Sequence, residues 1–141
     1  MKNKDKALIK DAVKYVKECC DFFDDEVEVI FVPNNKINQY YAHIAISRQR
    51  NQSTIKINKT SWARVNDFEK YFLVIHELAH AVADRVYGFN IQDHGKEWRF
   101  VMRHLGIRKP KAFGLIKYDL NRYKLKAKLR ERYTAEYAVG G

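Results

Sequence analysis

Apolar residues recur at helical spacing in three stretches of the chain. In residues 5–23 they fall three or four positions apart, which places them on one face of an amphipathic helix. A longer stretch with this spacing begins at Asn66, and Glu69 follows three residues later as the other half of a capping box. Gly88 suits the end of that helix. The segment GKEWRFVMRHL then predicts a shorter helix that ends at Gly106.

Three short segments have the pattern of β-strands instead. They are VEVIFV (27–32), YYAHIAIS (40–47) and STIKIN (53–58), all rich in β-branched or aromatic residues. The first stops at Pro33 and an Asn-Asn turn signal, and RQRNQ between the other two suits a hairpin loop. The spacing predicts a small three-stranded antiparallel sheet.

The order of these elements predicts an α+β domain: an N-terminal helix, the sheet, and then helices. Residues 118–138 predict a last helix, with Leu125, Leu129 and Tyr133 along one side and basic residues around the rest. We expect one domain over residues 1–116. We expect residues 117–141 to form a basic helical tail, either part of that domain or appended to it.

Composition excludes several classes of protein. The chain has 141 residues, of which 46% are hydrophobic, so it can bury a core and is not expected to be disordered. It contains no run of eighteen apolar residues and no secretory h-region, so we expect a cytoplasmic protein without a membrane partner. The two cysteines are adjacent and no C-x-x-C occurs, which excludes a cysteine zinc ribbon in this sequence.

Positive charge is concentrated in the last third of the chain. Residues 1–95 hold 14 basic and 13 acidic side chains, whereas residues 96–141 hold 13 basic and 4 acidic ones. This asymmetry favours a polyanion partner, with DNA first, although a solvated basic helix would have the same composition. The candidate DNA contacts are Lys117, Arg122, Lys124, Lys126, Lys128, Arg130 and Arg132.

The chemistry is expected in the sequence HELAH, which starts at residue 76. On a helix, His76 and His80 are separated by a rise of about 6 Å and a rotation of about 40°. Both rings can therefore turn a nitrogen toward one zinc ion, at about 2.0–2.1 Å each. Glu77 lies one position away, beside the ion rather than on it, where a general base can take a proton from water.

A catalytic zinc ion usually takes three protein ligands and leaves a fourth position for water. His94 is our candidate for the third ligand, because the chain reverses after Gly88 and a glycine follows His94. Asp93, Glu97 and Asp84 are alternatives. Asp84 lies one further turn along the face of His76 and His80, and we expect it to accept a hydrogen bond from a ligand imidazole.

Two histidines on a buried helix are often ordinary core residues, and HExxH alone leaves that interpretation open. Here the motif lies within a capped helix, follows a small sheet and precedes a His-Gly pair, all of which favour a metal site. Trp98 and Met102 lie four residues apart, so core packing is the expected role for both rather than contact with a substrate.

HELAH followed by HGKEW, with Met102 four residues beyond the tryptophan, resembles the SprT-like family of zinc metallopeptidases. That family includes the DNA–protein-crosslink protease Spartan. The resemblance covers residues 5–115 and implies a zincin-type fold, zinc held by His76, His80 and His94, and Glu77 as the catalytic residue. It also implies proteolysis of DNA-associated proteins, although many family members carry a zinc ribbon that this sequence lacks.

Two functions are compatible with these patterns. The first is a zinc-dependent endopeptidase that binds a protein or peptide substrate along an exposed sheet edge, at either strand 40–47 or strand 53–58. The second is a nucleic-acid-binding module with a structural zinc site and no proteolysis. The second needs a fourth protein ligand, for which Asp93 or Glu97 is available, and it leaves Glu77 without a role.

Overall fold

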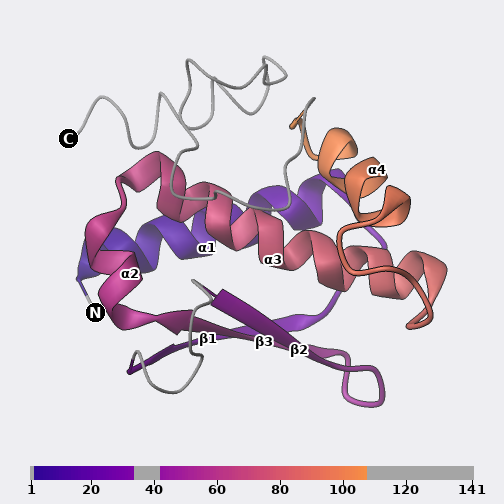
Figure 1. Cartoon of the computed structure of the whole chain (residues 1–141), viewed down its shortest axis with the longest axis horizontal. Helices are drawn as coiled ribbons and strands as arrows, with labels where there is room; N and C mark the ends of the chain where they lie inside the picture. Colours follow the sequence, from indigo (N-terminus) through magenta and orange to yellow (C-terminus); the bar gives the residue numbers. More distant parts are fainter. Residues whose placement is uncertain (1, 34–41, 108–141) are drawn as a thin grey trace.

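The structure, a computed structural model that describes residues 2–33 and 42–107, has a three-stranded sheet with helices on one face (Figure 1). The elements are α1 (Asn3–Cys19), β1 (Glu26–Val32), β2 (Ala42–Ser47), β3 (Gln52–Asn58), α2 (Lys59–Arg64), α3 (Asp67–Tyr87) and α4 (Lys96–His104). This order confirms the predicted α+β class. None of these helices combines the length and apolar composition of a membrane-spanning segment.

The basic tail predicted over residues 117–141 lies outside the described residues, as do its seven candidate DNA contacts. The division into residues 1–116 and 117–141 therefore stays a prediction.

The sheet is mixed, and the prediction of an antiparallel sheet was wrong. β3 lies in the middle of the strand order β1-β3-β2. β2 and β3 form the predicted antiparallel hairpin, with Ser47 opposite Gln52. β1 pairs with β3 in parallel, from Glu26 opposite Gln52 to Val32 opposite Asn58. A short loop between two consecutive strands predicts that they pair in an antiparallel direction. β1 and β3 are not consecutive, so no local pattern encodes their relative direction.

Helix α3 is the central element of the core. Its N-terminus has the predicted capping box: the side chain of Asn66 accepts from the amide of Glu69 at 2.8 Å, and the amide of Asn66 donates to Glu69 Oε1 at 3.1 Å. Every residue from 71 to 79 is buried. Gly88 ends the helix with φ 90° and ψ 178°, a conformation that is essentially restricted to glycine. Because it is capped and buried, α3 is a rigid support for the side chains on it.

Two local predictions differ from the structure. α1 ends at Cys19 rather than at residue 23, because the backbone of Cys20 leaves the helical conformation, with φ −130° and ψ 75°. Phe23 still enters the core, whereas Phe22 is exposed. The short helix α2 was not predicted at all. It is capped by Asn58, whose side chain accepts from the amide of Ser61 at 3.0 Å.

Candidate metal centre

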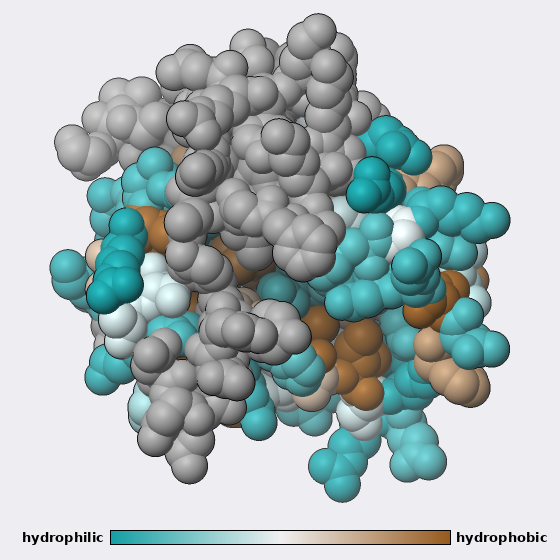
Figure 2. Space-filling view, viewed as in Figure 1, coloured by the Kyte–Doolittle hydropathy of each residue, from teal (hydrophilic) through white to brown (hydrophobic). Residues whose placement is uncertain are grey.

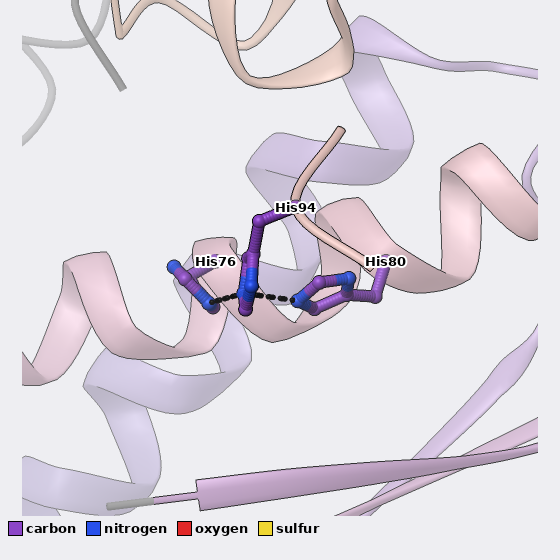
Figure 3. Close-up of side chains that lie close together, drawn as sticks. All are labelled: His76, His80 and His94. Atoms are coloured by element: carbon purple, nitrogen blue, oxygen red, sulfur yellow. Dashed lines mark hydrogen bonds between the residues drawn. The ribbon is translucent and has the colours of Figure 1, made fainter. Parts of the chain in front are cut away.

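Three histidine side chains converge between α3 and the loop that precedes α4 (Figure 3). His76 and His80 lie on the same face of α3, and their ring centroids are 5.2 Å apart. His94 reaches toward them from the loop. Its Nε2 lies 3.2 Å from Nε2 of His76 and 3.1 Å from Nε2 of His80. The structure thus brings together the three residues that the sequence predicts as metal ligands.

The spacing of these nitrogens suits one metal ion. Nitrogens that are each about 2.0–2.1 Å from a tetrahedral ion lie about 3.3 Å from one another. The two measured distances, 3.2 Å and 3.1 Å, are close to that value. Three imidazoles are also a ligand set that leaves one tetrahedral position open. The residues present therefore fit a metal ion with an open coordination position.

The protein environment keeps the three imidazoles neutral, as metal ligation requires. Burial lowers the pKa of His76 well below its ordinary value, and the neighbouring His80 and His94 lower it further. Burial also lowers the pKa of His80, to about 4, against the opposing charge of Asp93. The pKa of His94 is lowered by burial in the same way. At neutral pH each ring thus has a lone pair for a metal ion.

Glu77 follows His76 on α3, and the residue is only 5% exposed. Burial raises the pKa of its carboxyl group to about 8, and the negative charge of Asp93 contributes in the same direction. A bound cation would favour the ionised form and oppose this shift. A buried carboxyl group that titrates near neutral pH beside a metal site is a candidate proton acceptor.

Backbone geometry between α3 and α4 places His94. The amide of Gly95 donates to the carbonyl of Gln92 at 3.1 Å, and Arg99 Nε donates to the carbonyl of His94 at 3.2 Å. Gly95 has an ordinary φ of −79°, but a Cβ there would meet Cβ of Gln92 at 3.0 Å. A side chain at residue 95 would therefore crowd Gln92 within the turn, whereas the φ angle itself does not require glycine.

The three carboxylates considered as alternative ligands have different surroundings. Asp84 accepts two hydrogen bonds from Arg48, at 2.9 Å and 2.6 Å, so its carboxylate already has a partner other than an imidazole. Asp93 is better placed for the role predicted for Asp84, because its carboxylate oxygens lie 3.5 Å from Nδ1 of His80 and 3.5 Å from Nδ1 of His94. Among the described residues, the group able to hold a metal includes neither of these aspartates nor Glu97.

Trp98 packs against all three imidazoles. Its ring centroid lies 4.8 Å from those of His76 and His94 and 5.5 Å from that of His80, and the last pair is stacked. Its Nε1 donates to the carbonyl of His76 at 3.3 Å, and the side chain is completely buried. The predicted core role of Trp98 and Met102 is confirmed, since both are 0% exposed. Trp98 follows His94 by four residues and lies in the first turn of α4, and this short separation is the signal for its additional contact with the candidate ligands.

One contact that sequence reasoning missed lies at the C-terminal end of α3. The guanidinium of Arg48, just after β2, pairs with Asp84 and lies 4.6 Å from the ring centroid of Phe89. Phe89 is exposed, as are Val86 and Tyr87 beside it. Figure 2 shows hydrophobic surface among hydrophilic residues on this side of the molecule. No short-range pattern links Arg48 to residues so far along the chain.

Comparison with known proteins gives short but close matches. The chain is 53% identical over 30 residues to Protein SprT of Pseudomonas putida strain GB-1, and the same identity is found with Protein SprT of Pseudomonas entomophila. Protein SprT of Pseudomonas fluorescens strain SBW25 is 50% identical over a stretch of the same length. Each match spans 21% of this chain and 18% of the relative, so most of both proteins lies outside it.

The sequence profile of the SprT-like family matches far more of the chain, from residue 9 to residue 128. This range contains α3, the loop with His94, and α4. On the strength of that match, and in agreement with the resemblance seen in HELAH and HGKEW, the chain belongs to the SprT-like family.

Proposed function

We propose that this protein is a zinc-dependent endopeptidase of the SprT-like type with a zincin-like fold. The observation that carries the proposal is the convergence of three histidine Nε2 atoms, with a buried glutamate next to one of these histidines on α3. His76, His80 and His94 have the spacing of ligands to one ion, and Glu77 lies next to His76 on α3. A metal site with a free carboxylate beside it and an open position is suited to hydrolysis.

Zinc fits this ligand set because neutral imidazoles are among its preferred ligands and three of them leave a fourth position open. When bound, zinc supplies Lewis acidity, which polarises a peptide carbonyl and lowers the pKa of a water molecule to about 7. His76 and His80 would hold it from the rigid helix and His94 from the loop. Trp98 lies against the three rings and excludes water from that side of the site.

Glu77 is the proposed general base. Its carboxylate accepts a proton from the attacking water and then donates that proton to the nitrogen of the leaving amine. Burial raises the pKa of Glu77 to about 8 in the metal-free protein, and a bound cation would favour the ionised form that accepts a proton. Burial on α3 also fixes the position of the carboxylate relative to the two helix-borne imidazoles.

The structure also narrows the choice of substrate-binding edge. Strand β3 is paired on both sides, so of the two strands considered from the sequence only β2 is at an edge of the described sheet. β2 packs against α3, and the charge of His43 on β2 contributes to lowering the pKa of His80. We propose that an extended peptide adds to the free edge of β2 through backbone hydrogen bonds, with its scissile bond near the metal.

The alternative, a nucleic-acid-binding module with a structural zinc site, has less support. A structural site is closed by four protein ligands. Within the described residues the metal-binding group has three members, and neither Asp93 nor Glu97 joins it.

Association with DNA remains part of the proposal, supported by the excess of basic residues beyond residue 95. Binding through phosphate contacts should weaken with salt at a slope equivalent to about three to five contacts. Replacing Lys124, Lys126 and Lys128 with glutamine in the full chain should reduce that slope and leave zinc binding intact. An unchanged slope would contradict the assignment of these residues.

The test of the enzyme itself is Glu77→Gln. The amide cannot accept the proton, so peptide hydrolysis should fall by about 10²–10⁴-fold while one zinc ion per chain is retained. Glu97→Gln is the matched control: it makes the same change at a partly buried glutamate of α4 that the metal cluster does not include, and it should retain activity. Equal hydrolysis by wild type and Glu77→Gln would refute the proposed function.

A further inference from the structure

Asp93 lies where one carboxylate can contact two of the proposed metal ligands. Its Oδ1 is 3.5 Å from Nδ1 of His80, and its Oδ2 is 3.5 Å from Nδ1 of His94. The Nε2 atoms of the same two rings face each other at 3.1 Å on the other side. Each ring therefore has one nitrogen toward the carboxylate and the other toward the position of the metal.

This arrangement determines where the ring protons belong. A neutral imidazole carries one N–H, and a carboxylate can only accept a hydrogen bond. The favourable tautomer next to Asp93 has the proton on Nδ1, for both His80 and His94. The two Nε2 lone pairs then face each other at 3.1 Å, an arrangement that is repulsive until a cation lies between them.

His76 is different. Its Nδ1 is buried, and no hydrogen-bond partner for it exists among the described residues. Without metal, the proton can lie on Nε2 and be donated to Nε2 of His94, 3.2 Å away. Ligation through Nε2 requires the proton to move to Nδ1. Two ligands thus have a carboxylate that favours the ligating tautomer, and the third does not.

We infer that Asp93 is a positioning residue that holds His80 and His94 in the Nδ1–H tautomer, so that both present Nε2 to the metal before it arrives. The inference rests on the proposed metal site and extends it to a residue outside the ligand set. Such outer carboxylates fix ring orientation and tautomer, and their loss typically lowers metal affinity by about 10–100-fold.

The experiment compares the wild type with Asp93→Ala and Asp93→Asn, using zinc as the probe. Histidine tautomers are assigned by ¹⁵N NMR in the zinc-free full-length protein, and zinc affinity is measured by competition with a chelator. The side chain of Asp93 is 80% exposed, so both variants should fold. Asp84→Ala is the matched control, because Asp84 follows His80 by four residues on α3 but its carboxylate binds Arg48.

In the wild type, His80 and His94 should show the Nδ1–H tautomer without zinc, and His76 should change tautomer when zinc is added. Asp93→Ala should mix the tautomers of His80 and His94 and weaken zinc binding by about 10–100-fold. Asp93→Asn should lie between the wild type and Asp93→Ala in both tautomer populations and zinc affinity, since one amide oxygen replaces two carboxylate acceptors. Asp84→Ala should match the wild type in both measurements.

Unchanged tautomers and affinity in Asp93→Ala would overturn the inference while leaving the metallopeptidase proposal intact. Failure of the wild type to bind zinc would instead remove the proposed function. The tautomers of the zinc-free protein still decide the role of Asp93 in that case, so the two failures are distinguishable.

Discussion

The three candidate metal ligands come from two regions with opposite properties. Helix α3 contributes His76 and His80 from a capped element whose middle is buried on all sides. The segment of residues 88–95 contributes His94 from a connection in which most side chains are partly or fully exposed. On α3 the ligand spacing is fixed by helical geometry alone, whereas His94 depends on the turn before α4 and a few side-chain contacts.

This difference separates stability from metal affinity. Changes in α3 disturb the core itself, because the residues around the histidines are the largest part of it. Changes in the segment 88–95 can move the third ligand with little effect on the fold. Metal binding should in turn stabilise the segment 88–95 more than α3, because the bound ion would connect this exposed segment to the rigid helix.

The largest effect expected is that of zinc on the stability of the zinc-free protein. At a free zinc concentration 1,000-fold above Kd, the gain is about 4 kcal/mol, or about 10 °C in Tm for a domain of this size. Amide hydrogen exchange should slow most strongly in residues 88–95 and least in α3. His94→Ala should lose the thermal shift and keep the zinc-free Tm. Equal protection of both regions would contradict the comparison.

The second prediction concerns the pH dependence of the zinc-free protein. The folded pKa of Glu77, about 8, lies above its ordinary value of 4.5, so the folded state binds the additional proton. The contribution of Glu77 to stability must therefore fall as pH rises from about 4.5 to about 8. Glu77→Gln removes this loss and should be more stable than the wild type at pH 8, by an amount on the order of 3 kcal/mol, and similar to it at pH 4.5.

The measurement is urea unfolding with a chelator across this pH range. His80 acts in the opposite direction: its folded pKa, about 4, lies below its ordinary value of 6.5, so stability falls as pH drops below about 6.5. This contribution is present in both proteins and cancels in their difference. Parallel stability curves for wild type and Glu77→Gln would show that the buried carboxyl group does not titrate as described.

A smaller effect is expected at the junction of the two regions. Gly88 has φ 90° and ψ 178°, where a side chain costs about 1–3 kcal/mol. Gly88→Ala should lower the free energy of unfolding by about that amount and weaken zinc binding, because the segment that carries His94 starts there. Val86→Ala, a substitution at an exposed residue two positions earlier, is the control. It should alter neither the free energy of unfolding nor the affinity for zinc. If Gly88→Ala leaves the free energy of unfolding unchanged, the segment can start in another conformation.

The smallest effect is expected for Arg48, which joins the loop after β2 to the end of α3. Its pair with Asp84 is partly exposed, at 40% and 14% of the two side chains, so its removal should change the free energy of unfolding less than any of the changes above. A double-mutant cycle with Arg48→Ala and Asp84→Ala measures the coupling. A coupling as large as the effect of Gly88→Ala would show that the pair is more important to this part of the fold than its exposure suggests.

Local patterns predicted the elements of the fold far better than their arrangement. The capping box of Asn66 and Glu69 and the hairpin between β2 and β3 are encoded within a few residues, and both are confirmed. The parallel pairing of β1 with β3 depends on a connection between non-neighbouring strands. Direction in such a pair is decided by tertiary packing, which the sequence pattern of a single strand does not contain.

The same division applies to the site. His76 and His80 follow from helical periodicity, and His94 from a glycine-flanked position at a suitable distance. The carboxylates were harder to assign, because Asp84 and Asp93 both lie within reach of the ligands in sequence. Arg48, which engages Asp84, comes from a distant hairpin, so only the folded structure distinguishes the two.

The contact of Trp98 with all three imidazoles gives the protein an optical reporter of its own. Indole emission responds to charge and polarity within a few ångströms, and this indole is fully buried against the rings that would receive the metal. The chain contains one other tryptophan, Trp62, which instead contacts Phe31, Asp5 and Lys70. In a Trp62→Phe background the intrinsic fluorescence of Trp98 would follow occupancy of the site directly, without a label or a substrate.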